Sequence, residues 1–352
     1  MKQEHYYRQM NKSQQAAYYA MMEGFLAISP EFDVPRLENR DLTDIFFRLR
    51  LDHPEIFYVN TFSYRFTDIG DSVRMTPRYM FEKKKILEHR KALDARVTRL
   101  VRQAQGLTPL EKELFIHDFI TSNVTYDKLK KQYSHEIIGP LAQGIGVCEG
   151  IAKTVKILCD RLGLGCIIAV SDADPDNGVR YRHAWNLIEL DGKWYHMDAT
   201  FDNSLGRYGA KRFDYFNLSD RQIFADHRPS MYLIPECGDS RRGYYIENRL
   251  ALTKTEDVGK RLKAVVRKGQ PHFVFQWRGG YLNRDILGAI LEEAAQAAAE
   301  GGKEVYMSMN PGQMVIELTL KDNGDGGSGE SRPAICVEQA DEGDIDERER
   351  MQ

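Results

Sequence analysis

The spacing of apolar residues predicts a helical N-terminal region that contains one pair of strands. Apolar side chains recur every three to four residues in three stretches, as on the buried face of a helix. The predicted helices are residues 6–28, 42–51 and 81–105. Residues 56–66 and 72–80 instead alternate between apolar and polar positions, which predicts two strands joined around Gly70. Asp41 stands just before the second helical run as a candidate N-cap.

Glycines and a capping signal delimit the predicted elements in the middle of the chain. Thr108 and Glu111 form a capping box, which predicts a helix from there to residue 123. A second run with helical spacing covers residues 148–162 and stops at a glycine. Two β-prone runs, residues 181–190 and 193–201, are separated by Asp-Gly, the pair most typical of a two-residue hairpin turn. We therefore expect a helix followed by a hairpin.

Strand-like and helix-like runs alternate after a turn-rich linker at residues 229–243. The expected elements are residues 244–252, 255–267, 272–277, 282–300, 303–310 and 314–320. Such alternation predicts a small α/β module in which helices cover one sheet. From Lys321 onward, acidic residues far outnumber basic ones and few apolar groups remain, so we expect a disordered acidic tail.

These patterns divide the 352 residues into four predicted parts. They are residues 1–106, a helical region with a β-hairpin; 107–230, the core; 240–320, the small α/β domain; and 321–352, the tail. A composition of 42% hydrophobic and 29% charged residues is ordinary for globular protein. The chain therefore has enough apolar residues to bury a core.

Charge and hydropathy argue against two classes of partner. The net charge of −3 disfavours nucleic acid, which usually requires a clustered basic surface. The first ten residues lack the apolar stretch of a secretory signal, and no run approaches the length of a membrane span. We expect a cytoplasmic protein that binds neither nucleic acid nor a membrane.

Cysteine spacing and one acidic loop bear on metals and cofactors. The five cysteines are irregularly spaced without a C-x-x-C pair, which is typical of reduced thiols and of neither a disulfide framework nor a zinc site. Asp172, Asp174 and Asp176 alternate as in a calcium loop, but the glycine comes one position late and His183 occupies the twelfth position. We expect a surface loop there, and neither a metal nor a cofactor.

Three residues of the core suit thiol chemistry. Cys148 lies in the first turn of its predicted helix, where backbone N–H groups and the helix dipole favour a thiolate. A two-residue turn would place His183 opposite Thr200 and Trp185 opposite Asp198. Asp198 would then lie diagonal to His183 on one face, about 7–8 Å away at Cα. Each residue alone is more often structural, but the three together favour catalysis.

The motifs around these residues resemble the transglutaminase-like cysteine enzyme superfamily. They are G-x-C-x-G-x-A around Cys148, H-A-W-N from His183 and D-x-T from Asp198. The resemblance spans residues 107–228, because H-D-F-I-T-S-N-V-T-Y-D before the motifs and Y-F-N-L-S-D with Asp-His after them are similar to its bacterial branch. Ile151 and Phe201 depart from residues common in relatives and could reshape a substrate cleft.

The resemblance implies an α+β fold and a catalytic triad. In its papain-like or transglutaminase-like core, the cysteine-bearing helix packs on an antiparallel sheet. Cys148 matches the nucleophile, His183 the base and Asp198 the orienting acid. His117 and Asp118 match no site position and are expected to serve packing and capping. The implied partner is a protein or peptide substrate.

The reaction itself stays open between alternatives. A Cys–His–Asp set forms a thioester with the substrate. In an amide hydrolase water attacks this thioester, and in a cross-linking acyltransferase an amine attacks it. A silent member would instead bind peptide or scaffold a partner. The backbone N–H of Cys148 is one expected oxyanion donor. Gln143 and His135 are candidates for the second, and each is about equally consistent with a plain loop residue.

Overall fold

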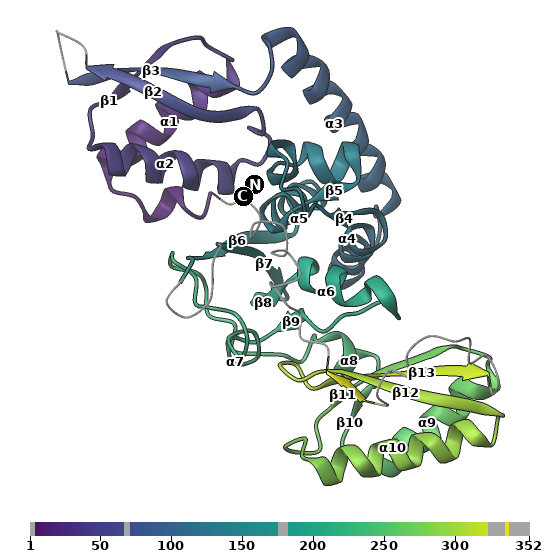
Figure 1. The fold of residues 1–352 in the computed structure, drawn as a ribbon. Helices are drawn as coiled ribbons and strands as arrows, with labels where there is room; N and C mark the ends of the chain where they lie inside the picture. The colour runs from purple at the N-terminus through teal and green to yellow at the C-terminus, as the bar shows by residue number, and fades with distance from the viewer. Residues whose placement is uncertain (1–3, 67–70, 175–181, 323–334, 338–352) are drawn as a thin grey trace, which may run out of the picture. The chain divides into compact units, whose positions relative to one another are not determined.

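The computed structural model describes residues 4–66, 71–174, 182–322 and 335–337 (Figure 1). The chain forms two compact units: unit 1 is Met1–Lys193 with Ser230–Ile234, and unit 2 is Trp194–Pro229 with Pro235–Gln352. Both units combine helices with mainly antiparallel strands, so the predicted α+β class is confirmed. No helix within the described ranges combines the length and the apolar character needed to cross a membrane.

Unit 1 begins with a three-stranded antiparallel sheet of order β1-β3-β2. The bounds are α1 Lys12–Leu26, β1 Phe32–Pro35, α2 Asn39–Asp52, β2 Val59–Phe66 and β3 Ser72–Tyr79. Figure 1 shows α1 and α2 on the same side of this sheet. Val73, Met75 and Pro77 alternate as buried residues along β3, so the apolar face is the covered one. The alternation that predicted these two strands therefore reflects one-sided burial.

Two predicted helix starts in this region were wrong. α1 begins at Lys12, not near residue 6, because the Asn11 side chain accepts the N–H of Gln14 and Gln14 returns the hydrogen bond in a capping box. Residues Tyr7–Gln9 form a separate 3₁₀ turn. With Asp41 as the N-cap, α2 would begin at residue 42. It begins at Asn39 instead, with Glu38 at the N-cap. Apolar periodicity located both helices but not their first residues.

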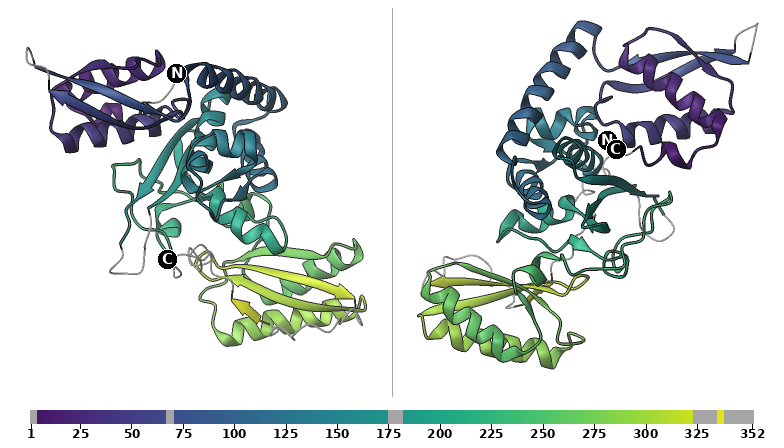
Figure 2. Two further views of the ribbon diagram at one scale, coloured as in Figure 1. Left: turned by 45° about the horizontal axis from the view of Figure 1, so that its top comes forward. Right: turned by 180° about the vertical axis from the view of Figure 1, so that it is seen from behind.

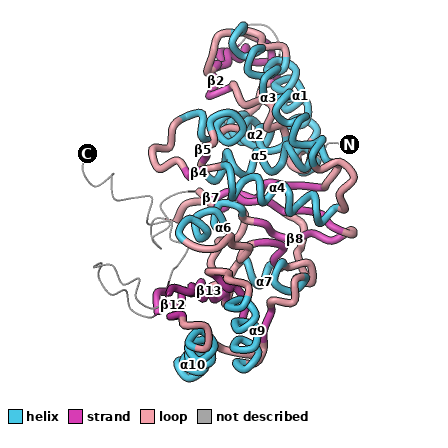
Figure 3. Tube along the Cα trace, turned by 90° about the vertical axis from the view of Figure 1, so that its right-hand side faces the viewer, coloured by secondary structure: helices cyan, strands magenta, loops and turns pink. Residues whose placement is uncertain are grey.

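The remainder of unit 1 is built around α5, the helix that starts at Cys148. The bounds are α3 Lys83–Gln103, α4 Pro109–Asn123, β4 Thr125–Tyr126, β5 Ile145–Gly146, α5 Cys148–Leu162, β6 Gly165–Ser171 and β7 His183–Leu190, with short helical turns at Gln132–His135 and Gly139–Gln143. α5 packs against α3 and α4 and against the antiparallel pair β6 and β7; Figure 3 shows α4 beside it. The capping box that begins α4 at Thr108 and Glu111 is confirmed.

The predicted two-residue turn follows β7. β7 ends at Leu190, and β8 (Lys193–Met197) begins after Asp191 and Gly192. Both turn residues have positive φ, 51° and 73°, as the type I′ turn of a tight hairpin requires. Glycine tolerates this backbone without strain, and aspartate is among the few other residues that adopt it.

Unit 2 ends in a five-stranded sheet of order β10-β11-β13-β12-β14. The bounds in unit 2 are α6 Ala199–Leu205, β9 Phe216–Leu218, α7 Asp220–Ile223, α8 Tyr244–Glu247, β10 Ala251–Leu252, α9 Thr255–Arg267, β11 His272–Trp277, α10 Arg284–Ala299, β12 Lys303–Asn310, β13 Val315–Asp322 and β14 Ile335–Val337. Figure 2 shows α9 and α10 on one side of this sheet, and their apolar faces form a common core with it. β8 pairs antiparallel with β9.

Two strands expected in unit 2 were wrong. Residues 244–252 form a helical turn and only the two-residue β10, because Arg249 adopts a positive φ of 56° that interrupts any extended run. The strand expected to reach residue 201 ends at Met197, where α6 follows. Within the expected tail, β14 pairs parallel with β12, while residues 323–334 and 338–352 lie outside the described residues. The division into four parts stays a prediction.

Candidate active site

Cys148 is the first residue of α5, in the position expected from its motif. Val147 provides the N-cap, and the thiol is partly exposed. The Cys148 Sγ lies 4.0 Å from the carbonyl oxygen of Arg182, the residue before β7. The thiol therefore sits among the N-terminal N–H groups of a helix, beside the start of the strand that begins with His183.

His183 is buried at the start of β7. Its ring stacks on Trp185 with centroids 5.8 Å apart and planes 15° from parallel, and its backbone pairs with Ser171 of β6. Three residues further along β7, the Asn186 side-chain amide donates to the Ala152 carbonyl of α5 at 3.0 Å. The H-A-W-N motif thus supplies a ring, a stacking partner and a bond that holds the strand against the cysteine helix.

A cluster of buried and partly buried charges, which we call the α5 ion cluster, secures the first turns of α5. It consists of Arg50, His135, Glu136, Glu149 and Lys153. The buried Lys153 Nζ lies 2.7 Å from Glu149, 2.9 Å from Glu136 and 3.2 Å from the His135 carbonyl oxygen. Arg50 also pairs with Glu136. Two cations and two carboxylates balance, which is the condition under which buried charge is tolerated.

Electrostatics in this cluster keep Glu149 ionised. Burial has the largest effect on the Glu149 pKa and raises it, but Lys153, the His135 ring and Arg50 together outweigh burial and lower it well below its usual range. Glu149 adjoins Cys148 in sequence, so its contacts with Lys153 and His135 fix the backbone that carries the thiol.

Close packing against Ser134 explains why the second glycine of the cysteine motif, Gly150, is a glycine. A Cβ at this position would lie well inside 3.0 Å of the Ser134 carbonyl oxygen, which is backbone and cannot move aside cheaply. The same carbonyl oxygen accepts the Val147 N–H at 3.1 Å. The turn Gln132–His135 therefore packs directly on the start of α5, and only glycine permits that approach.

Gly150→Ala is expected to lower the free energy of unfolding by about 3 kcal/mol, because the added methyl must push α5 away from Ser134. Urea unfolding measures this. Gly288→Ala provides the matched control: Gly288 is exposed in α10 with open space around its Cβ, so alanine there should stabilise the protein by about 0.5 kcal/mol. Equal unfolding midpoints for Gly150→Ala and wild type would contradict the packing argument.

The two candidate oxyanion donors occupy different settings. The His135 ring is partly exposed, and its Nδ1 lies 3.3 Å from Glu149 Oε2. Gln143 ends the turn Gly139–Gln143, and its exposed side chain forms no hydrogen bond with a described residue. Both residues stay predictions as oxyanion donors.

The acidic loop that was expected to bind no metal also stays a prediction. Asp172 pairs with Arg182 at 3.0 Å, while Asp176 lies outside the described residues.

Asp198 belongs to unit 2, where it is the N-cap of α6. Its Oδ1 accepts the N–H groups of Thr200 at 2.8 Å and Phe201 at 3.1 Å, and its side chain is buried. The predicted register was therefore wrong in one respect: Thr200 is helical and cannot face His183 across a hairpin. The D-x-T motif is a helix cap in which the aspartate carboxylate is fixed by backbone N–H groups.

The His227 ring is a hydrogen-bond partner of the Asp198 carboxylate, and the sequence analysis did not predict this contact. The His227 Nε2 lies 2.9 Å from Asp198 Oδ2, and its Nδ1 lies 2.7 Å from Asp226 Oδ1. The ring and both carboxylates belong to unit 2, and His227 is buried. The Asp226-His227 pair is part of the family resemblance, so the sequence does contain a signal for it. The contact between His227 and Asp198 is visible only in the structure.

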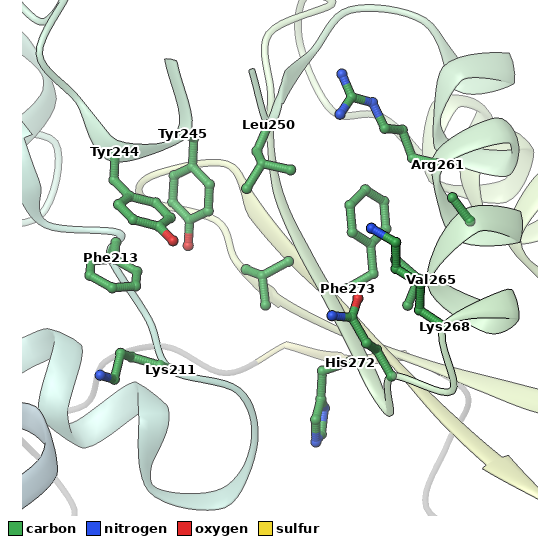
Figure 4. A pocket seen from close by; sticks show the side chains of 13 residues that line it. Lys211, Phe213, Tyr244, Tyr245, Leu250, Arg261, Val265, Lys268, His272 and Phe273 are labelled. Carbon is green, nitrogen blue, oxygen red and sulfur yellow. The ribbon is translucent and has the colours of Figure 1, made fainter. Parts of the chain in front are cut away.

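Unit 2 also contains an open groove that includes none of the predicted site residues (Figure 4). Its volume is about 340 Å³, and one wall is the stacked pair Phe213 and Tyr244, with ring centroids 3.7 Å apart. Arg261 and Lys268 of the α9 region line the opposite wall in Figure 4. The groove offers basic and aromatic groups but no nucleophile with a neighbouring base.

Comparison with known families supports the resemblance. Residues 95–199 match the sequence model of the transglutaminase-like superfamily. The matched segment includes Cys148, His183 and Asp198. The predicted resemblance to this superfamily is thus confirmed, and this segment carries a transglutaminase-like core. No curated protein matches the sequence.

The solved structures that match share little sequence with this chain. A crystal structure of a transglutaminase (TGase) is 16% identical, with 40% of this chain and 44% of that chain covered and a TM-score of 0.26. A candidate cysteine protease from Cytophaga hutchinsonii is 21% identical, with 31% and 37% covered and a TM-score of 0.27. A candidate protease from Parabacteroides distasonis is 16% identical, with 41% and 37% covered and a TM-score of 0.23. This chain spans less than half the length of each.

Proposed function

We propose that this protein is a thiol-dependent amide hydrolase, a peptidase or amidase, in which Cys148, His183 and Asp198 form the catalytic triad. The observation that carries the proposal is the position of Cys148, partly exposed at the start of α5 and 4.0 Å from the backbone of the residue before His183. Further support comes from the family match, whose segment includes all three residues. The proposed substrate is a protein or peptide.

In the proposed reaction, the Cys148 sulfur attacks the carbonyl carbon of an amide. His183 takes the thiol proton and later gives it to the departing amine, which leaves a thioester on Cys148. Water attacks the thioester, with His183 again as base, and releases the acid. The N–H groups at the start of α5 stabilise the negative oxygen of each tetrahedral intermediate, with His135 or Gln143 as the second donor.

Asp198 fits the role of the orienting acid in this scheme. The N–H groups of Thr200 and Phe201 and the His227 ring hold its carboxylate in one orientation. A rigid buried carboxylate holds a base in one tautomer and stabilises its charged form.

Acyl transfer to an amine is the alternative outcome of the same thioester. The family match names the transglutaminase-like superfamily, and the choice between water and an amine depends on how well the cleft excludes water. An assay that offers dansylcadaverine together with a glutamine-containing protein separates the two. Fluorescent labelling of the protein supports transfer, whereas release of ammonia or peptide without labelling supports hydrolysis.

The first test of the triad is the pH dependence of cysteine alkylation. We expect iodoacetamide to modify Cys148 faster than the buried cysteines near neutral pH, because its thiol is partly exposed and His183 takes the thiol proton in the proposed pair. His183→Ala should slow this by at least about tenfold at pH 7. Peptide mass spectrometry reads each cysteine separately, and the buried Cys159, Cys166 and Cys237 serve as slow internal references.

A histidine variant outside the site provides the control for alkylation. His89→Ala removes an imidazole from α3, and the Cys148 rate should stay at the wild-type value. If Cys148 reacts no faster than a free thiol, or equally fast in His183→Ala, the thiol–imidazole pair does not exist. The protein would then belong to a different class, a peptide-binding or scaffold protein.

A further inference from the structure

We propose that unit 2 contains a zinc site formed by His196, Asp220 and Cys237. The ring nitrogen of His196, a carboxylate oxygen of Asp220 and the sulfur of Cys237 all lie within 4.8 Å of one another. The three come from separate parts of the chain, namely β8, the first residue of α7 and the loop after Pro235. Nitrogen, oxygen and sulfur donors of these types are the ligands that Zn²⁺ takes in proteins. The site involves none of the proposed triad residues.

Hydrogen bonds already hold the three residues in one arrangement. His196 Nε2 lies 2.8 Å from Asp220 Oδ1, and Asp220 Oδ2 accepts the Cys237 N–H at 2.9 Å. The backbone N–H of Asp220 donates to the Cys237 carbonyl at 2.8 Å. Asp220 is thus hydrogen-bonded to the His196 ring and to the backbone of Cys237. An ion entering here would find its donors ordered beforehand, which lowers the entropy cost of binding.

Zinc takes a cysteine ligand as its thiolate. Binding at Cys237 would therefore form a Zn–S bond and release the thiol proton to solvent. One proton should therefore leave for each ion bound.

The geometry permits a zinc ion after a small rearrangement. Ligand atoms about 2.0–2.3 Å from zinc lie roughly 3.3–3.8 Å apart in a tetrahedron. The three ligand atoms already lie within 4.8 Å of one another, and His196 Nε2 and Asp220 Oδ1, 2.8 Å apart, would separate slightly to admit the ion. His196 and Cys237 are fully buried, whereas the Asp220 side chain is 32% exposed. Asp220 thus gives the ion a route from solvent and leaves room for water as the fourth ligand. The ion would tie the loop around Cys237, which has no helix or strand, to β8.

Metal titration of the full-length protein tests this site. We use Cys148→Ser as the background, because it removes the partly exposed thiol while leaving the three ligands intact. After treatment with chelator and reductant, we expect one equivalent of Zn²⁺ to bind in calorimetry. Titrations in buffers of different ionisation enthalpy should show about one proton released per ion. Co²⁺ should give a thiolate-to-metal charge-transfer band in the near ultraviolet.

Ligand variants decide whether Cys237 and Asp220 bind the ion. Adding Cys237→Ser should abolish the Co²⁺ band and weaken Zn²⁺ binding by about 100-fold or more. Asp220→Asn, at the partly exposed ligand, is the second variant in case Cys237→Ser does not fold, and it should weaken binding while keeping the band. His272→Gln changes a histidine elsewhere in unit 2 and should bind normally. Absence of the Co²⁺ band in the background protein, or Zn²⁺ binding unchanged by Cys237→Ser, overturns the proposal.

Discussion

Cys148→Ala should reduce amide turnover by about 10⁴-fold or more while leaving the fold intact, if the proposed triad is correct. The sulfur supplies the bond that makes the thioester, and no neighbouring group can replace it. The side chain is partly exposed, and its sulfur makes only a weak contact, at 4.0 Å, with the Arg182 carbonyl oxygen. Its removal should therefore cost less than about 1 kcal/mol of stability. Hydrolysis of reduced, unfolded casein and the dansylcadaverine assay measure activity, and urea unfolding measures stability.

Two further variants make this test specific. Cys148→Ser keeps the size of the side chain but lacks a thiolate, and it should be nearly as inactive as alanine. Asp198→Asn retains an oxygen for the N–H groups of Thr200 and Phe201, so α6 should stay capped while the negative charge of the carboxylate is lost. We expect this variant to keep a larger residual rate than the cysteine variants. Undiminished activity in Cys148→Ala would refute the assignment of the nucleophile.

Arg212→Ala should lower the free energy of unfolding by about 3–5 kcal/mol, because it leaves two buried carboxylates without their cation. Arg212 is 1% exposed. Its guanidinium lies 2.6 Å and 3.0 Å from the two oxygens of Asp214 and 3.3 Å from Glu317 of β13. Asp214 also accepts the Tyr245 hydroxyl at 2.9 Å and the Asn310 amide at 3.0 Å. This network joins the segment before β9 to the C-terminal sheet.

A conservative variant and a surface variant calibrate this loss. Arg212→Lys keeps the charge but cannot form the two parallel bonds to Asp214, so its destabilisation should be intermediate. Arg221→Ala removes an exposed arginine without a described ion pair and should change stability by no more than about 0.5 kcal/mol. Urea unfolding of the three variants gives the comparison. A loss below about 1 kcal/mol for Arg212→Ala would show that the network contributes little.

Local signals predicted local structure well where a few neighbouring residues decide the outcome. Thr108 and Glu111 satisfy each other's backbone groups within four residues, and Asp191 with Gly192 adopts the positive φ values of a tight turn. Such features depend on short-range sterics and hydrogen bonds. They appear in the structure where the sequence places them.

Predictions failed where two local conformations compete for the same residues. The stretch after Met197 alternates polar and apolar residues as a strand would, yet Asp198 caps a helix with its side chain. Asn11 delays α1 in the same way, and Arg249 interrupts an expected strand. Alternation and capping are both compatible with such sequences, and tertiary packing selects between them.

By itself, the sequence determined the order and spacing of the three motifs, the α+β class and the resemblance that the family match confirms over residues 95–199. Only the tertiary structure brought Arg50 and Lys153 together at Glu136, placed the His227 ring against the Asp198 carboxylate, and gathered His196, Asp220 and Cys237. The physical reason is that periodicity and capping act over a few residues. Contacts between side chains tens to about a hundred positions apart depend on how the helices and sheets pack.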